Sequence, residues 1–172
     1  MIGKKMEAAL NRQVNAEFYA SYIYLSISAY FESISLPGFA GWMRMQSMEE
    51  VTHAMKIFNH INERGGRVTL TAIEAPPAEW SSPLEAFKAA NGHEQKVTGM
   101  INDLVDLAIA EKDHAANAML QWFVTEQVEE EMNTDGYVQK LTLAGDSPNA
   151  LFMLDRELGA RKFTMPPASE EE

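Results

Sequence analysis

The 172-residue sequence contains no cysteine. That absence excludes disulfides, cysteine-ligated zinc, iron–sulfur clusters and thiol nucleophiles. Long apolar runs are also missing: no stretch approaches the ~18 apolar residues of a membrane-spanning helix, and no apolar run follows Lys4 and Lys5 as it would in a signal peptide. We therefore expect a soluble, cytoplasmic protein without a membrane partner.

Positive charge is scarce. The chain has 14 Lys and Arg against 25 Asp and Glu, a formal net charge of −11. Sequence-independent nucleic-acid binding depends on basic residues that neutralise phosphates, so we expect no nucleic-acid partner, and cations are the more natural ligands. Hydrophobic residues make up 46% of the chain, which is enough to fill the core of one domain of this length.

Glycine and proline are absent from residues 4–35, where apolar residues recur at helical spacing. Helical spacing of apolar residues, breaks at Gly and Pro, and capping residues together predict five helices. They span residues 4–35, 39–64, 83–112 and 113–144, with a short fifth helix after Asp146-Ser147-Pro148. Residues 67–82 contain Pro76-Pro77 and form a crossing segment, whose ~16 extended residues reach ~50 Å and can return the chain along a ~40 Å helix.

These elements predict an all-α fold. Short connections make the first two long helices one antiparallel hairpin and the next two another, so the expected fold is a four-helix bundle with a long crossover and a short fifth C-terminal helix. Residues 1–163 should form one domain. Residues 164–172 are polar, acidic and proline-containing, which predicts a disordered tail.

The core-facing seams, read at alternating steps of three and four, are apolar toward their ends and acidic near the middle. Glu17, Glu50, Glu94 and Glu130 fall roughly eleven to eighteen residues into their helices and therefore meet at one level of the bundle. Buried carboxylates need a counter-charge, and no seam supplies Lys or Arg. Two divalent cations would balance the charge, with His53 as a nitrogen ligand one turn from Glu50.

Each of these residues also has a simpler explanation when taken singly. A lone seam glutamate is usually a rim residue, and His53 or Tyr24 could be hydrogen-bonded core side chains. Gln127 can either touch a metal or orient a carboxylate. Three other histidines (His60, His93 and His114) lie off the seams and are expected at the surface.

A second acidic cluster is expected beside the first. Glu126, Glu129 and Glu130 are spaced for one helix face, and Glu49 adjoins Glu50. The cluster could be an acidic rim in contact with solvent. However, the next lysine on the same helix is Lys140, which is more than one turn away, so we favour a bound cation as the counter-charge for these carboxylates.

The pattern as a whole resembles the ferroxidase centre of ferritins, particularly the non-haem ferritins of bacteria and archaea. The matching elements are Glu17-x6-Tyr24, Glu49-Glu50-x2-His53, Glu94 and Gln127-x2-Glu130, together with flanking runs such as LNRQVNAEFYASYIYLS and LQWFVTEQVEEE. The resemblance covers residues ~5 to ~163. Bacterioferritins and rubrerythrin-type proteins repeat Glu-x-x-His in the second hairpin, where this chain has Gln127-x2-Glu130, which argues against both. Val51 also stands where the haem-binding Met of bacterioferritin would be, so haem is not expected. A tail ending Glu170-Glu171-Glu172 argues against the DNA-protecting cages.

The resemblance implies that the chain is a ferroxidase. It would oxidise Fe(II) with O2 at two irons and deposit ferric mineral inside a homo-oligomeric cage, which has 24 subunits in this family. Glu50 would bridge, Glu17 and His53 would complete one iron position, and Glu94 and Glu130 the other. Tyr24 would serve as a hydrogen-bond or one-electron donor.

The same relatives imply a weaker third iron at Glu49, Glu126, Glu129 and Glu130. Two alternatives stay open: a peroxide-consuming diiron protein that protects against iron-driven oxidative damage, and a structural subunit without a working centre. The residues that line the three-fold pore of animal ferritins are not acidic here (115–120), so the route by which iron enters is left open. The sequence also does not distinguish O2 from H2O2 as oxidant.

Overall fold

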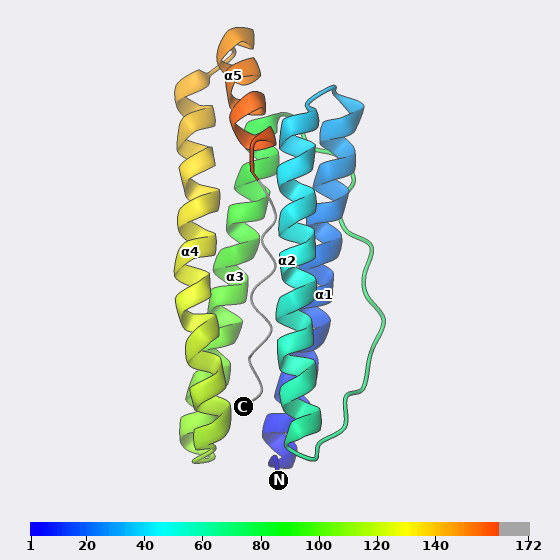
Figure 1. The fold of residues 1–172 in the computed structure, drawn as a ribbon, viewed down its shortest axis with the longest axis vertical. Helices are drawn as coiled ribbons and strands as arrows, with labels where there is room; N and C mark the ends of the chain where they lie inside the picture. The colour runs from blue at the N-terminus through cyan, green and yellow to red at the C-terminus, as the bar shows by residue number, and fades with distance from the viewer. Residues whose placement is uncertain (162–172) are drawn as a thin grey trace.

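The computed structural model describes residues 1–161, which form five helices and no strand (Figure 1). The helices are α1 (Lys4–Ser33), α2 (Pro37–Glu63), α3 (Pro83–Ala110), α4 (His114–Ala144) and α5 (Pro148–Gly159). The first four run side by side as two hairpins, and α5 lies at one end of the bundle. The predicted all-α bundle with a short fifth helix is confirmed; the predicted tail 164–172 lies outside the described residues.

Helix boundaries follow the predicted capping residues closely. The α2 helix begins at Pro37, two residues earlier than expected, because proline is well suited to the first helical turn, where its missing N–H is not needed. Ser82 accepts a hydrogen bond from the Glu85 amide at the start of α3, and Asp113 accepts one from the Ala116 amide at the start of α4.

The crossover between α2 and α3 runs along the length of α1 (Figure 1). Two asparagines on α1 hold it there. Asn11 donates to the Arg67 carbonyl at 3.0 Å and accepts from the Thr69 amide at 2.7 Å, and Asn15 donates to the Ala72 carbonyl at 3.2 Å. These bonds satisfy backbone groups in a segment that has no regular structure of its own.

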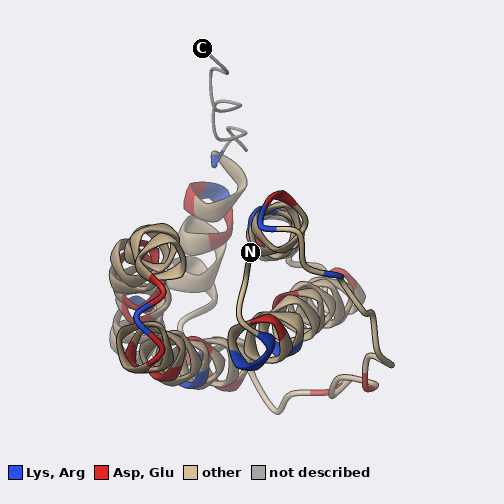
Figure 2. Cartoon of the chain, turned by 90° about the horizontal axis from the view of Figure 1, so that it is seen from below, with Lys and Arg blue, Asp and Glu red and all other residues tan. Residues whose placement is uncertain are grey.

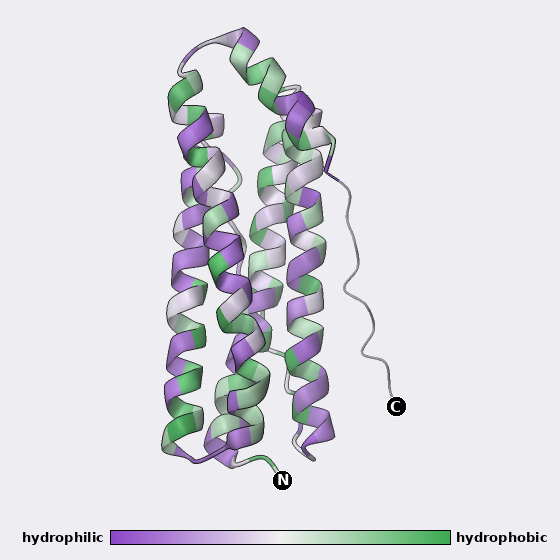
Figure 3. Cartoon of the chain, turned by 60° about the vertical axis from the view of Figure 1, so that its left-hand side comes forward, coloured by the Kyte–Doolittle hydropathy of each residue, from purple (hydrophilic) through white to green (hydrophobic). Residues whose placement is uncertain are grey.

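The core is divided into two apolar clusters, one toward each end of the bundle. One includes Leu10, Ile57, Ile101, Leu120 and Phe123, and the other includes Phe31, Phe39, Trp42, Met43 and Phe87. Each fully buried large side chain contributes about 1.5–3 kcal/mol of hydrophobic stabilisation. Hydrophobic and hydrophilic residues alternate along each long helix (Figure 3), as expected for a helix with one apolar stripe that faces the core. Within residues 1–161, no helix combines the length and apolar character that a membrane span requires.

The surface expectation for the three histidines is met in full only by His114, because His60 and His93 are half-buried. His114 is exposed, but most of His93 is covered, its ring lies edge-on against Tyr19 of α1 at 6.0 Å, and its Nε2 atom has no hydrogen-bond partner among the described residues. Burial lowers the pKa of His93 to about 4, so it is neutral at physiological pH. The seam pattern missed it because it lies at the α1–α3 contact rather than on the central axis.

The α5 helix is attached to the start of α2. The Asp155 carboxylate accepts hydrogen bonds from the amides of Gly38 and Phe39 at 2.8 and 3.1 Å, and Leu158 is buried. Gly38 is required here, since a Cβ atom at this position would lie 1.8 Å from the Asp155 carbonyl oxygen. This attachment brings the end of α5 close to the middle of α2.

Candidate metal centre

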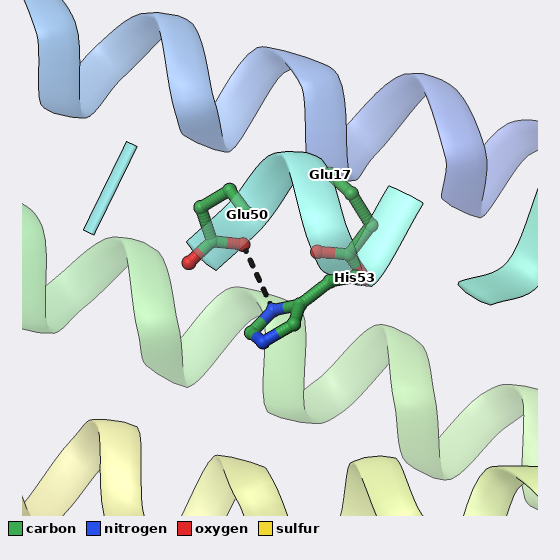
Figure 4. Close-up of side chains that lie close together, drawn as sticks. All are labelled: Glu17, Glu50 and His53. Carbon is green, nitrogen blue, oxygen red and sulfur yellow. Dashed lines mark ion pairs between the residues drawn. The ribbon is translucent and has the colours of Figure 1, made fainter. Parts of the chain in front are cut away.

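Three potential metal ligands from the first hairpin converge between the two apolar clusters. Glu17 on α1 and both Glu50 and His53 on α2 are 1–3% exposed, and one ligand atom from each lies within 4.8 Å of the others. His53 Nδ1 lies 3.3 Å from Glu50 Oε2 (Figure 4). The sequence predicted that these three residues would face one another.

The second hairpin contributes two more carboxylates. Glu94 on α3 and Glu130 on α4 are 1% and 4% exposed, and Glu130 forms a second group of neighbouring ligand atoms with His53 and Glu126, again within 4.8 Å. Seen along the bundle, acidic residues occur on both hairpins (Figure 2). Glu94, Glu17 and Glu130 all act on the pKa of Glu50, so the four buried carboxylates lie near one another.

Hydrogen-bond donors surround these carboxylates. The Tyr24 hydroxyl donates to Glu94 Oε1 at 2.5 Å, and Gln127 Nε2 donates to Glu94 Oε2 at 3.3 Å. Of the two roles that the sequence left open for Gln127, this contact favours orienting a carboxylate.

Two further donors escaped the sequence reasoning. Gln13 Nε2 donates to Glu17 Oε1 at 2.8 Å, and Gln46 Nε2 donates to Glu130 Oε2 at 2.6 Å. Both signals were present in the sequence, because Gln13 lies one turn before Glu17 and Gln46 lies on the α2 seam. Each carboxylate other than Glu50 thus has a neutral side chain that holds one of its oxygens.

The carboxylates are strongly perturbed electrostatically. Burial raises the pKa of Glu17 to about 7 and that of Glu130 to about 9, and the neighbouring carboxylates add to the shift. Burial, followed by Glu94 and Glu17, also raises the pKa of Glu50 well above its usual range. The metal-free site therefore holds protons at neutral pH in place of positive charge.

Unpaired oxygens and a neutral imidazole make the site suited to a cation. Glu17 Oε2 and Glu50 Oε1 are buried and have no hydrogen-bond partner among the described residues. Burial and nearby Lys56 lower the pKa of His53 to about 4, so its ring is neutral and can act as a nitrogen ligand. Hard oxygen ligands with one imidazole fit iron and other first-row divalent ions.

The second acidic cluster is only partly assembled as predicted. Glu126 Oε1 lies 3.9 Å from His53 Nε2, while Glu129 is exposed. Glu49 is paired with Arg161, whose Nη2 lies 2.8 Å from Glu49 Oε2. The spacing argument considered basic residues on the same helix and so missed this counter-charge, which comes from the end of α5.

Comparisons with known proteins agree with this geometry. The family model described as Ferritin-like domain matches residues 7–144. The bacterial non-heme ferritins of Bacteroides fragilis and Staphylococcus aureus are 44% and 41% identical over 161 and 163 residues, covering 94% and 95% of this chain and 100% and 98% of theirs.

Solved structures give the same result. A closed form of the Archaeoglobus fulgidus ferritin engineered by mutagenesis has a TM-score of 0.95 and 54% identity, covering 95% of this chain and all of that one. The open-pore ferritin of the same archaeon has a TM-score of 0.94 and 53% identity, over 94% of this chain and all of that one.

A four-helix bundle with carboxylates and a histidine at its centre defines the class of ferritin-like metal-binding proteins. The chain belongs to the ferritin family, and within it to the non-haem ferritins of the bacterial and archaeal type. The family and fold predicted from the sequence are therefore confirmed, and iron storage is the general function of that family.

Proposed function

We propose that this chain is an iron-oxidising subunit of a storage cage, which converts Fe(II) to Fe(III) at a dinuclear centre and passes the product inward to a ferric mineral. The observation that carries the proposal is the group of buried carboxylates, in which Glu17 Oε2 and Glu50 Oε1 have no hydrogen-bond partner within residues 1–161. An unpaired buried carboxylate oxygen is costly, and a bound cation removes that cost.

The residues divide into two iron positions. Glu17 and His53 would hold the first iron, Glu94 and Glu130 the second, and Glu50 would bridge them, since its carboxylate lies against His53 and is influenced by both Glu94 and Glu130. The Tyr24 and Gln127 donors would keep Glu94 oriented toward its iron.

Oxygen ligands stabilise Fe(III) more than Fe(II), which favours electron transfer to an oxidant. Two Fe(II) ions together supply two electrons, so one O2 and two protons give one H2O2 without release of superoxide. The buried ligands exclude bulk water, and the protons that they hold in the metal-free state leave as iron binds.

The direct test is to soak crystals anaerobically in Fe(II) and locate iron from its anomalous scattering. Two peaks per subunit, one beside Glu17 and His53 and one beside Glu94 and Glu130, are expected. Stopped-flow oxidation with O2 and with H2O2 then separates the proposed ferroxidase from a peroxide-consuming protein, in which H2O2 oxidises the bound iron faster than O2. A single peak, or none, would contradict the dinuclear assignment.

We further propose a weaker third iron held by Glu49, Glu126, Glu129 and Glu130. Glu126 lies close to Glu130 and His53, and the pKa of Glu126 is raised by burial and by Glu129 and Glu49, which indicates that these carboxylates repel one another. An iron that uses Glu49 must displace the guanidinium of Arg161, so this position should fill last.

Replacing Glu126 and Glu129 together by alanine should preserve the initial oxidation of two irons but change the number of irons oxidised per O2 and slow growth of the mineral. Oxygen-electrode titration measures the ratio. The matched control is Asp103→Ala with Asp106→Ala, which removes two exposed acids at the same spacing on α3. An unchanged ratio, with no third anomalous peak in the wild-type protein, would show that these glutamates form a solvent-exposed acidic rim and do not bind a third iron.

Storage requires a closed assembly, and we propose a cage of 24 subunits. Several large apolar side chains are exposed in the single chain, among them Leu70, Leu143, Phe152 and Met153 at 64–90%. Large apolar side chains that gather on a surface, as Phe152 and Met153 do on α5, mark sites of protein–protein contact.

Light scattering should therefore give one large species whose proportion rises with salt, because subunits of net charge −11 repel one another over a Debye length of ~8 Å at physiological ionic strength. A stable monomer or dimer at every salt concentration would count against storage as the function.

A further inference from the structure

The end of α5 places a guanidinium beside the metal centre. Arg161 Nη2 donates to both oxygens of Glu49, at 2.9 and 2.8 Å, and Nη1 donates to Gln46 Oε1. The guanidinium carbon lies 5.0 Å from the centre of the Trp42 ring, a cation–π contact. Arg161 is therefore held by three residues of α2.

Gln46 connects this guanidinium to a predicted iron ligand. Its side chain is completely buried, and its Nε2 atom donates to Glu130 Oε2 at 2.6 Å. A guanidinium carries only donors, so it can bind only the oxygen end of the Gln46 amide. The amide must then turn its NH2 group toward Glu130.

Removing the guanidinium leaves the amide free to rotate by half a turn. The rotated amide would present a lone pair to the Glu130 carboxylate, which repels the ionised form that binds a metal. The charge of Arg161 itself acts mainly on Glu49, with which it shares two hydrogen bonds. Its effect on Glu130 is transmitted by the orientation of the amide.

The attachment of α5 does not depend on Arg161. Asp155 accepts from two amides at the start of α2, and Leu158 is 1% exposed in the core. A substitution at Arg161 should therefore leave α5 in place.

We infer that Arg161 is a positioning residue for the second iron position: it fixes the Gln46 amide, and through it the Glu130 carboxylate. The inference rests on the proposed function, because it takes Glu130 as a ligand. It assigns to α5 a direct influence on the metal centre, in addition to any role at the surface of the subunit.

The test is anaerobic binding of Co²⁺ to the metal-free full-length protein, followed by its visible absorption, which reports coordination without oxidation. Arg161→Gln should weaken the second Co²⁺ per subunit about five- to tenfold, the change expected when one charge-assisted hydrogen bond is lost, and leave the first within about twofold. Arg161→Lys keeps a donor-only group and should bind the second ion within about threefold of wild type. The matched control is Arg156→Gln, which removes an exposed positive charge from the same helix and should change neither affinity.

A double-mutant cycle separates positioning from a general structural effect. In a Gln46→Ala background, which has no amide to orient, Arg161→Gln should change the second affinity less than about twofold. An equal loss in both backgrounds, or no loss in the wild-type background, would overturn the inference. If the wild-type protein does not bind two Co²⁺ ions tightly, the proposed dinuclear centre fails instead.

Discussion

Glu50→Ala should abolish the fast oxidation of two Fe(II) ions per subunit while leaving the metal-free protein folded and at least as stable as the wild type. Glu50 is the proposed bridge, so its loss affects both iron positions. The rate should fall by more than the 10–100-fold typical of substitutions in residues that only support metal ligands. Stopped-flow absorbance measures the rate, and thermal unfolding of the metal-free protein measures the stability.

Stability is expected to survive because the substitution relieves crowding of like charges. The Glu50 carboxyl is 2% exposed, one of its oxygens has no partner among residues 1–161, and Glu94, Glu17 and Glu130 all raise its pKa after burial itself. Glu50→Gln, which leaves no cavity, and Glu63→Ala, which removes an exposed acid from the same helix, are the controls. A fall of many degrees in the melting temperature of the metal-free Glu50→Gln protein would make Glu50 a structural residue.

The metal-free protein should lose stability as the pH rises from 6.5 to 9. The pKa of Glu17 is about 7 and that of Glu130 about 9 in the folded chain, against an ordinary value of 4.5, so the folded state binds more protons than the unfolded state in this range. Stability then decreases with pH, by about 1.4 kcal/mol per pH unit for each extra bound proton. A decrease of about 5–10 °C in melting temperature is expected.

The histidines oppose this slope only at the start of the range. The pKa values of His53 and His93 are lowered from 6.5 to about 4, so near pH 6.5 the unfolded state binds more histidine protons than the folded state, and well above pH 7 both rings are neutral in either state. Glu130→Gln should flatten the dependence between pH 7 and 9, whereas Glu63→Ala should not. A melting temperature that stays constant or rises across this range would show that the buried carboxylates are already ionised without metal.

Helical periodicity predicted the central part of this structure well. Steps of three and four predict seven core-facing positions on each of α2 and α3, and all of them are buried: Phe39, Met43, Gln46, Glu50, His53, Ile57 and Ile61 on α2, and Phe87, Ala90, Glu94, Val97, Ile101, Leu104 and Ala108 on α3. A step of three or four residues determines which side of a helix faces a neighbour, and this is sufficient to place Glu17, Glu50, Glu94 and Glu130 at one level. Proline and capping residues predicted helix ends to within about two residues.

Contacts between elements distant in sequence could not be predicted in the same way. Arg161 reaches Glu49 and Gln46 only because Asp155 and Leu158 attach α5 to α2, and periodicity within a helix carries no information about that attachment. His93 was misassigned for a related reason, since its burial depends on how closely α1 and α3 approach away from the central axis.

The division of the metal centre between two hairpins also links iron supply to the integrity of the subunit. Glu17, Glu50 and His53 come from α1 and α2, while Glu94 and Glu130 come from α3 and α4. Iron held by both groups, as proposed, would be a reversible cross-link between the hairpins, in addition to the crossover, the shared apolar core and the attachment of α5 to α2. Its contribution grows with the logarithm of the free Fe(II) concentration, so amide hydrogens along the surfaces where the hairpins meet should exchange more slowly in an iron-rich cell than in an iron-poor one.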